Sequence, residues 1–314
     1  MNIYLYEDGE LIYDDGLIFK TMDKSISIPY QSVNNIFLFK NVLFDTNLIR
    51  KLNELDIRLF TFNKNNYYLL TDNLSQGDIT VAMTKAYISK KRISIAKSIL
   101  KSVWHNMITL LHSYHIDTTN TLFSKLKSEI KNKNDINILL LCEAKIRKLY
   151  YSYFNEIIKN PDFEFKSRIM NPPTDPINSL ISFINSLIYK DTLINILCSN
   201  LNASIAFLHS ATDRKSSLEY DISEIYKPLI VDRVIFTLIN KKIISSDDFI
   251  YNTNMCIIKP NSKKKIIEVY ERKINSTVTK HNKRIKYKDL ILSDCIKLRR
   301  YLLNEQRQIS FYKE

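Results

Sequence analysis

The chain has 314 residues, of which 45% are hydrophobic and 25% are charged. This composition is too apolar for a disordered protein, and the length favours two globular domains over one core. Lys and Arg total 46 against 33 acidic residues, a formal net charge of +13. Such an excess favours an anionic partner, with nucleic acid as the simplest choice and an anionic membrane surface as the competitor.

Targeting signals and the placement of cysteines indicate the cellular compartment of the protein. The N-terminus lacks the order of basic, apolar and small residues that marks a signal peptide. Apolar stretches such as 136–142 are far shorter than the ~20 residues needed to span a bilayer. The four cysteines are scattered without a C-x-x-C pair, which is typical of reduced, buried thiols and not of a disulfide frame or zinc site. We therefore expect a cytoplasmic protein that does not act at a membrane.

The first 75 residues predict a small β domain. Asp8-Gly9 and Asp15-Gly16 separate short apolar runs, and Asp-Gly supplies the positive φ of tight hairpin turns. A short helix is expected over 46–55, with Leu48, Ile49, Leu52 and Leu55 on one face. The expected strands are 2–6, 11–13, 17–20, 25–28, 36–39, 58–62 and 67–71.

Residues 76–314 predict a larger α-helical domain, because no glycine follows Gly77 and the apolar spacing becomes helical. Four of the seven prolines lie between 161 and 176 and indicate a rigid loop between two helical groups. The fold class is therefore α+β: a small N-terminal β-sheet domain followed by an all-α C-terminal domain. The expected helices are 79–114, 119–132, 134–159, 176–197, 202–211, 217–226 and 228–240, with more after 285.

One carboxylate lies in an apolar setting within the helix expected over 134–159. Glu143 follows Leu139-Leu140-Leu141-Cys142, and a carboxylate near a core is costly unless it is paired or binds an ion. An i,i+4 ion pair with Arg147, worth about 0.3–0.5 kcal/mol on a surface, would satisfy it. A metal-ligand role is the alternative, and this residue alone leaves both open.

A second polar group combines an imidazole with two acids. Ser216-Ser217-Leu218-Glu219 has the form of a capping box, and a helix starting there places Asp221 and Glu224 at i,i+3 on one face. A chain reversal through 211–215 would bring His209 to them. The alternatives are a satisfied core histidine and acids placed favourably near a helix N-terminus. If the groups share an ion, two carboxylates and one imidazole suit Mg²⁺ or Mn²⁺.

Basic runs could track the phosphates of a nucleic acid. Each run alone is typical of a solvated helix face, and only their sum favours DNA binding. The runs are Lys90-Lys91-Arg92, Lys263-Lys264-Lys265, 280–288 and Arg299-Arg300.

Four motifs in the second half of the chain resemble those of the DNA integrase family of CRISPR adaptation, also called CRISPR-associated protein one. The resemblance covers nearly the whole chain, and its proline-rich stretch is highly specific. The motifs are Glu143…Arg147…Tyr150; Arg168…Pro172-Pro173-Thr174-Asp175-Pro176-Ile177-Asn178; Leu208-His209; and Ser217-Leu218-Glu219-Tyr220-Asp221-Ile222-Ser223-Glu224.

The resemblance implies a metal-dependent enzyme that joins the 3′-hydroxyl ends of new spacer DNA into a CRISPR repeat array by transesterification. It implies that Glu143, His209 and Glu224 hold Mg²⁺ or Mn²⁺, with Asp221 joining or supporting them. Arg147, Tyr150, Arg168 and Asn178 are then candidates for shaping the site or contacting DNA.

The resemblance also implies partners. These are double-stranded spacer and repeat DNA, a second copy of the chain through the β domain, and CRISPR-associated protein two. Two other functions stay open: a free-standing, structure-specific DNA nuclease, and a non-catalytic DNA-binding subunit.

Overall fold

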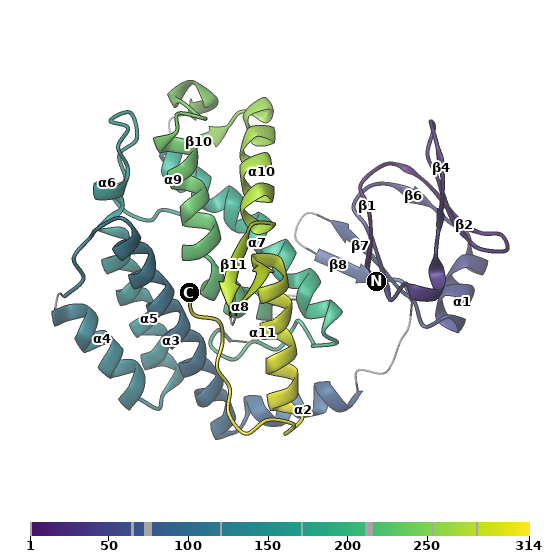
Figure 1. Ribbon diagram of the computed structural model, residues 1–314, viewed down its shortest axis with the longest axis horizontal. Helices are drawn as coiled ribbons and strands as arrows, with labels where there is room; N and C mark the ends of the chain where they lie inside the picture. The colour runs from purple at the N-terminus through teal and green to yellow at the C-terminus, as the bar shows by residue number, and fades with distance from the viewer. Residues whose placement is uncertain are drawn as a thin grey trace. The chain divides into compact units, whose positions relative to one another are not determined.

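The computed structural model describes residues 2–63, 66–71, 77–119, 121–170, 172–210, 216–252, 254–280 and 282–314. The chain is mixed α and β, as the sequence predicted, and separates into two compact units, Met1–Asp78 and Ile79–Glu314 (Figure 1). Each unit is described by itself below.

In the described part of the N-terminal unit, two four-stranded sheets have the orders β1-β5-β7-β8 and β4-β3-β2-β6. β1, β5 and β7 run parallel, with Ile36 opposite Leu59 and Phe37 opposite Phe60. The elements are β1 (Asn2–Leu5), β2 (Gly9–Tyr13), β3 (Leu17–Lys20), β4 (Ser25–Ile28), β5 (Asn35–Leu38), β6 (Val42–Leu43), α1 (Thr46–Glu54), β7 (Arg58–Asn63) and β8 (Asn66–Leu69).

The core of this unit is formed by side chains from both sheets and α1. Leu11 and Ile36 are fully buried together with Leu48 and Leu52 of α1, so the expected apolar face of this helix is confirmed. The helix begins where the side chain of Asp45 accepts a hydrogen bond of 2.7 Å from the backbone N–H of Leu48, which satisfies one of the free donors at a helix start.

The hairpin expected at Asp8-Gly9 is wrong. β1 and β2 belong to different sheets, and Gly9 begins β2 with no positive φ. A Cβ at Gly9 would lie 2.3 Å from the carbonyl oxygen of Lys20, so glycine is needed there for close packing of β2 on β3. At the second turn, β2 and β3 do form a hairpin, but the positive φ of 49° belongs to Asp15 and not to Gly16.

The C-terminal unit is built mainly from helices (Figure 1). They are α2 (Gly77–Tyr87), α3 (Lys90–Ser113), α4 (Thr121–Asn132), α5 (Ile136–Tyr151), α6 (Phe154–Ile157), α7 (Pro176–Cys198), α8 (Leu218–Tyr226), α9 (Arg233–Asn240), α10 (Pro260–Ile274) and α11 (Tyr287–Leu302). Two small hairpins, β9 (Phe249–Asn252) with β10 (Met255–Ile258) and β11 (Thr277–Lys280) with β12 (Lys283–Lys286), flank α10.

Several expected helix limits needed correction. The helix expected over 79–114 breaks before α3, where the side chain of Ser89 accepts from the backbone N–H of Lys91. The helix expected over 134–159 ends at Tyr151, and α6 follows as a separate turn. The two hairpins around α10 make the C-terminal unit mixed instead of all-α.

α7 is the central apolar helix of this unit. Asp175 caps it by accepting a 2.8 Å hydrogen bond from the backbone N–H of Asn178, and Pro176 occupies the first turn, a position that suits proline because no intrahelical donor is lost. Among the described residues it is the one helix long and apolar enough to cross a membrane. Its apolar window is 61% buried within the protein, which is typical of a core helix.

Candidate active site

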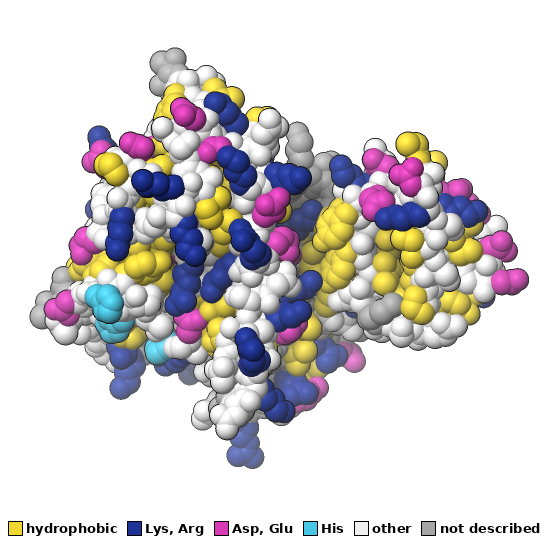
Figure 2. All heavy atoms as spheres, turned by 45° about the horizontal axis from the view of Figure 1, so that its top comes forward, with side chains coloured by type: hydrophobic (Ala, Val, Ile, Leu, Met, Phe, Trp, Pro, Cys, Tyr) yellow, Lys and Arg dark blue, Asp and Glu magenta, His cyan; other side chains and the backbone are white. Residues whose placement is uncertain are grey.

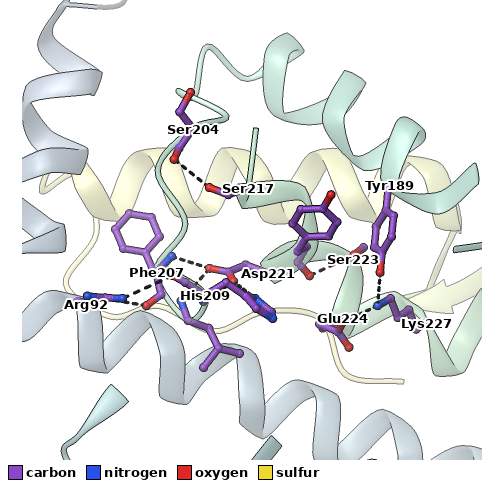
Figure 3. A network of polar contacts seen from close by, with 12 residues as sticks. Arg92, Tyr189, Ser204, Phe207, His209, Ser217, Asp221, Ser223, Glu224 and Lys227 are labelled. Atoms are coloured by element: carbon purple, nitrogen blue, oxygen red, sulfur yellow. Dashed lines mark hydrogen bonds and ion pairs between the residues drawn. The ribbon is translucent and has the colours of Figure 1, made fainter. Parts of the chain in front are cut away.

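Asp221 on α8 organises the segment that carries His209. Its Oδ2 accepts hydrogen bonds from the backbone N–H groups of Phe207 (2.6 Å) and Leu208 (2.8 Å) (Figure 3). Its Oδ1 accepts from the backbone N–H of His209 (3.0 Å) and contacts the ring Nδ1 of the same residue at 2.7 Å. The predicted approach of His209 to this helix is therefore confirmed, although the turn at 211–215 lies outside the described residues.

These bonds explain why the helix expected over 202–211 is wrong. The described residues 202–210 are non-helical, because the N–H groups of 207–209 donate to a carboxylate instead of to the preceding turn. The capping box is wrong as well. α8 starts at Leu218, and the carbonyl of Ala203 accepts from the N–H groups of Ser217 and Leu218. Ser216 donates its hydroxyl to the side chain of Glu219.

Two glutamates from different helices meet at one guanidinium. Arg147 Nε donates to Glu143 Oε1 on α5 at 2.8 Å, and its Nη2 donates to Glu224 Oε2 on α8. The i,i+4 ion pair considered from the sequence is thus present, and Glu224 joins it. Lys227 Nζ donates to the other oxygen of Glu224 at 2.5 Å and to the hydroxyl of Tyr189 on α7 at 2.7 Å.

Neighbouring charges shift the pKa values of Glu143 and His209. Burial raises the pKa of Glu143, but the charge and hydrogen bond of Arg147 and the charges of Lys227 and His209 outweigh it, so the net pKa lies below its ordinary value. Burial lowers the pKa of His209, but the hydrogen bond and charge of Asp221 and the charge of Glu143 raise it above the ordinary value.

Sequence reasoning missed Lys227, Tyr189 and Asp232. Lys227 could have been found from its i,i+3 spacing to Glu224, but Tyr189 and Asp232 carry no local signal. Burial raises the pKa of Asp232 to about 6, even though Tyr150 and the nearby cations lower it. Asp232 closes a π-helical turn over Pro228–Asp232, where its N–H donates to the carbonyl of Lys227. Such turns are frequent at functional sites, and here Pro228 accounts for it, because its ring clashes with regular α-helical packing.

The remaining predicted residues hold the surroundings in place. Tyr150 is fully buried and donates its hydroxyl to Asp232 at 2.7 Å. Arg168 Nη1 donates to Asn178 Oδ1 at 2.7 Å, and Nη2 donates to the hydroxyl of Ser182 at 3.0 Å. The amide of Asn178 donates back to the carbonyl of Ser167, so this pair fixes the proline-rich loop against α7.

The donor set can be compared with the needs of a divalent ion. Within the described residues, no group of three His, Cys, Asp or Glu side chains is placed to hold a metal ion as it stands, and Arg147 and Lys227 donate to oxygens of the two glutamates. The donor chemistry nevertheless fits. Two carboxylates share one cation, and the bond from Nδ1 to Asp221 leaves His209 Nε2 as the ligating atom, on a side chain that is 35% exposed.

Side chains of the basic run 90–92 form contacts within the protein. Arg92 Nε donates to the carbonyl of Phe207 at 3.0 Å (Figure 3), and its guanidinium lies 4.0 Å from the ring centroid of Tyr87. Lys91 donates to the side chain of Asn304. Elsewhere Lys and Arg side chains are spread over the surface of the helical unit (Figure 2), as expected if the basic surface is distributed.

Comparisons with known proteins place this geometry in a family. A family model described as CRISPR associated protein Cas1 matches residues 3–272. The chain is 31% identical to the CRISPR-associated endonuclease Cas1 of Fusobacterium nucleatum, over 99% of this chain and 96% of that protein. A Cas1 protein from Thermotoga maritima, 25% identical, aligns over the full length of both chains with a TM-score of 0.77.

Two more distant structures share the fold. A casposase bound to its integration product is 20% identical, with a TM-score of 0.76 over 99% of this chain and 97% of that one. A chain of a partial Cas6-RT-Cas1–Cas2 complex is 19% identical, with a TM-score of 0.77 over 100% and 99%. From the family model and the near full-length identity to the Fusobacterium protein, the chain belongs to the Cas1 family of CRISPR-associated proteins.

Proposed function

We propose that this protein is a metal-dependent DNA integrase of CRISPR adaptation, which joins the 3′-hydroxyl ends of new spacer DNA to the repeat array by transesterification. The observation that carries the proposal is the meeting of Glu143 and Glu224 at the guanidinium of Arg147, while Asp221, on the same helix as Glu224, holds the ring of His209. Membership of the Cas1 family and a net charge of +13 support a DNA substrate.

Three side chains would hold Mg²⁺ or Mn²⁺: Glu143, Glu224 and His209 through Nε2. When bound, the ion supplies Lewis-acid chemistry, by lowering the pKa of the attacking hydroxyl and offsetting charge on the phosphate. Asp221 is a positioning residue, since its two oxygens already accept from four N–H groups of the His209 segment. It keeps the proton of His209 on Nδ1 and the ring edge turned outward.

The cations of the site have a role of their own in this proposal. Arg147 and Lys227 balance the charge of Glu143 and Glu224. Tyr150, Arg168 and Asn178 shape the site through Asp232 and the proline-rich loop. None of these three needs to touch the reacting atoms.

We extend the partners of the family to this chain. Double-stranded spacer and repeat DNA are the substrates, and the similar Cas1–Cas2 assembly supports CRISPR-associated protein two as a partner. We assign dimerisation to the N-terminal β unit, whose sheet edges must be paired or covered, and catalysis to residues 76–314. An enzyme acting on a chromosomal array works in the cytoplasm.

The decisive experiment changes the nucleophile. The protein, with its small partner, is incubated in Mn²⁺ with a supercoiled repeat plasmid and a short duplex ending either in 3′-hydroxyl or in a dideoxynucleotide. Only the 3′-hydroxyl duplex should become covalently joined and relax the plasmid. Equal nicking by both duplexes without a joined product would assign a nuclease that uses water, which the name of the Fusobacterium relative keeps as the second candidate. If neither duplex is joined and the plasmid is not nicked, the protein would be assigned as a non-catalytic DNA-binding subunit.

Ligand variants test the residues. Glu143→Gln and Glu224→Gln should each lower joining at least ~10²-fold, because a metal ligand matters at least as much as the outer-shell partners whose loss costs 10–100-fold. Gel-shift affinity for the duplex should change little, because phosphate contacts are distributed over the basic surface. Glu268→Gln, at an exposed position on α10, is the matched control and should join normally. Wild-type joining by either site variant would remove that residue from the site.

A further inference from the structure

A cavity lies in the helical unit, formed by α3, α4 and the C-terminal segment. Its volume is about 380 Å³, which falls in the range of small-molecule sites. No residue of the Glu143, Glu224 and His209 cluster lines it. The side chains that give it chemical character are Lys101, Lys127, Lys131, Lys313, Trp104 and His105.

The four lysines give this cavity a strong positive potential. No acidic side chain is among its described lining residues, and none of the four ammonium groups forms an ion pair with a described carboxylate. Burial, and then the charges of Lys101 and Lys127, lower the pKa of Lys313. The ammonium groups therefore repel one another, and a bound anion would relieve that repulsion.

Trp104 adds a fixed aromatic surface to the cations. Its indole Nε1 donates to the carbonyl of Phe123 at 3.3 Å, which ties α3 to the start of α4. Lys127 Nζ lies 4.4 Å from the ring centroid. His105 Nε2 contacts the carbonyl oxygen of Glu314 at 2.8 Å, so the C-terminal segment is held as a wall of the cavity. The hydroxyls of Ser124 and Ser128 complete the lining with further donors.

We propose that this cavity binds a nucleoside phosphate, with the phosphate among the lysines and the base against Trp104. Lysine ammonium groups recognise phosphate as point charges, and an aromatic face beside them stacks a base, worth about 1–3 kcal/mol. The aromatic ring and the size of the cavity favour a nucleotide over an acidic peptide. If the proposed function holds, the nucleoside phosphate that binds in this cavity is one nucleotide of a DNA strand. A free nucleotide carries the same chemistry.

The protein supplies its own reporter, because Trp104 is the only tryptophan in the chain. The full-length protein is titrated with an eight-residue thymidine oligonucleotide, with thymidine monophosphate and with inorganic phosphate, and Trp104 fluorescence is followed. The oligonucleotide should quench it, since a stacked base contacts the ring. Quenching by the monophosphate at equal or lower concentration would identify the free nucleotide as the source. Inorganic phosphate alone should leave the ring unquenched.

Paired charge variants test the lysines. Lys101→Gln with Lys127→Gln should raise the Kd for quenching roughly tenfold, because two phosphate contacts are lost. The control, Lys264→Gln with Lys283→Gln, removes the same charge from exposed positions outside the cavity and should change the Kd less than twofold. An equal effect of both pairs would show that only overall charge matters and would overturn the site.

Other outcomes also overturn the proposal. The nucleotide assignment fails if the oligonucleotide leaves Trp104 fluorescence unchanged, or if only a glutamate-rich peptide alters it. The test is independent of joining, because Glu143→Gln should quench like the wild type. Joining without quenching would reject the nucleotide site and support the integrase. Quenching without joining would support the nucleotide site and reject the integrase.

Discussion

Replacing Asp221 with asparagine should destabilise the segment that carries His209. The change keeps the size of the side chain but converts one of its two acceptor oxygens into an NH₂ donor. In the structure each oxygen of Asp221 accepts two hydrogen bonds, and the residue is fully buried. Whichever way the amide is turned, two N–H groups of residues 207–209 will face a donor.

The size of the effect follows from these contacts. A hydrogen bond to a charged group contributes about 1.5–3 kcal/mol, and a buried donor left without an acceptor costs about 1–3 kcal/mol. Two lost contacts therefore predict a loss of about 3–5 kcal/mol in the free energy of unfolding. The bond from Arg92 to the carbonyl of Phe207 survives and limits the loss. At temperatures where the variant stays folded, joining should fall 10- to 100-fold, because the ring of His209 loses the partner that orients it.

Urea unfolding followed by Trp104 fluorescence measures this effect in the helical unit. Asp135→Asn is the matched control, since Asp135 caps α5 by accepting one N–H, from Ile138, and asparagine caps a helix about as well as aspartate. The control should change the free energy of unfolding by less than ~0.5 kcal/mol. If the two variants unfold at the same urea concentration, Asp221 does not anchor the segment and its assignment as a positioning residue is wrong.

Two further predictions concern stability outside the site. Burial raises the pKa of Asp191 from 3.8 to about 6. Because the folded state then binds this proton more tightly than the unfolded state, its contribution to stability is present below pH ~4 and is lost as the pH rises through ~6, about 3 kcal/mol in all. Urea unfolding of Asp191→Asn at pH 4.5 and 7 should show a smaller difference than in the wild type. In the N-terminal unit, Gly9→Ala should lower the melting temperature, because its Cβ would meet the carbonyl oxygen of Lys20. Gly16→Ala, where nothing lies within 4 Å of the added Cβ, should not; equal melting of the two would contradict the packing argument.

The sequence predicted those helices and strands that are determined by residues within or next to the element itself. Short apolar runs separated by turn residues predicted the strands of the N-terminal unit except β6, and α1 followed from the apolar face that includes Leu48 and Leu52. The start of α7 followed from Asp175-Pro176, a capping residue before a first-turn proline. The pairing of the strands could not be predicted from such local signals. The paired residues of the parallel strands β1 and β5 are 33 positions apart in the sequence, and the Asp8-Gly9 dipeptide carries no information about that contact.

The failures around the site have a tertiary cause. Residues 202–210 have helical spacing of apolar side chains, yet the buried carboxylate of Asp221 takes the N–H groups that a helix would use. β11 and β12 lie in a basic stretch that was interpreted as a charged run, because short polar strands bury too little to show a pattern. The ligand types and the pair of Glu143 with Arg147 could be proposed from the sequence, but the contact of Glu224 with Arg147 from another helix could not.

The arrangement of charges explains why these helices meet where they do. Glu143, which is partly buried, and Glu224, which is buried, would repel each other if they were brought together without cations. Arg147, one turn along from Glu143, donates to both, and Lys227, one turn along from Glu224, donates to the second. Each glutamate therefore has a cation on its own helix at a spacing set by the helical repeat. The cations therefore hold the carboxylates of Glu143 and Glu224 next to each other, and the proposed metal site requires this adjacency.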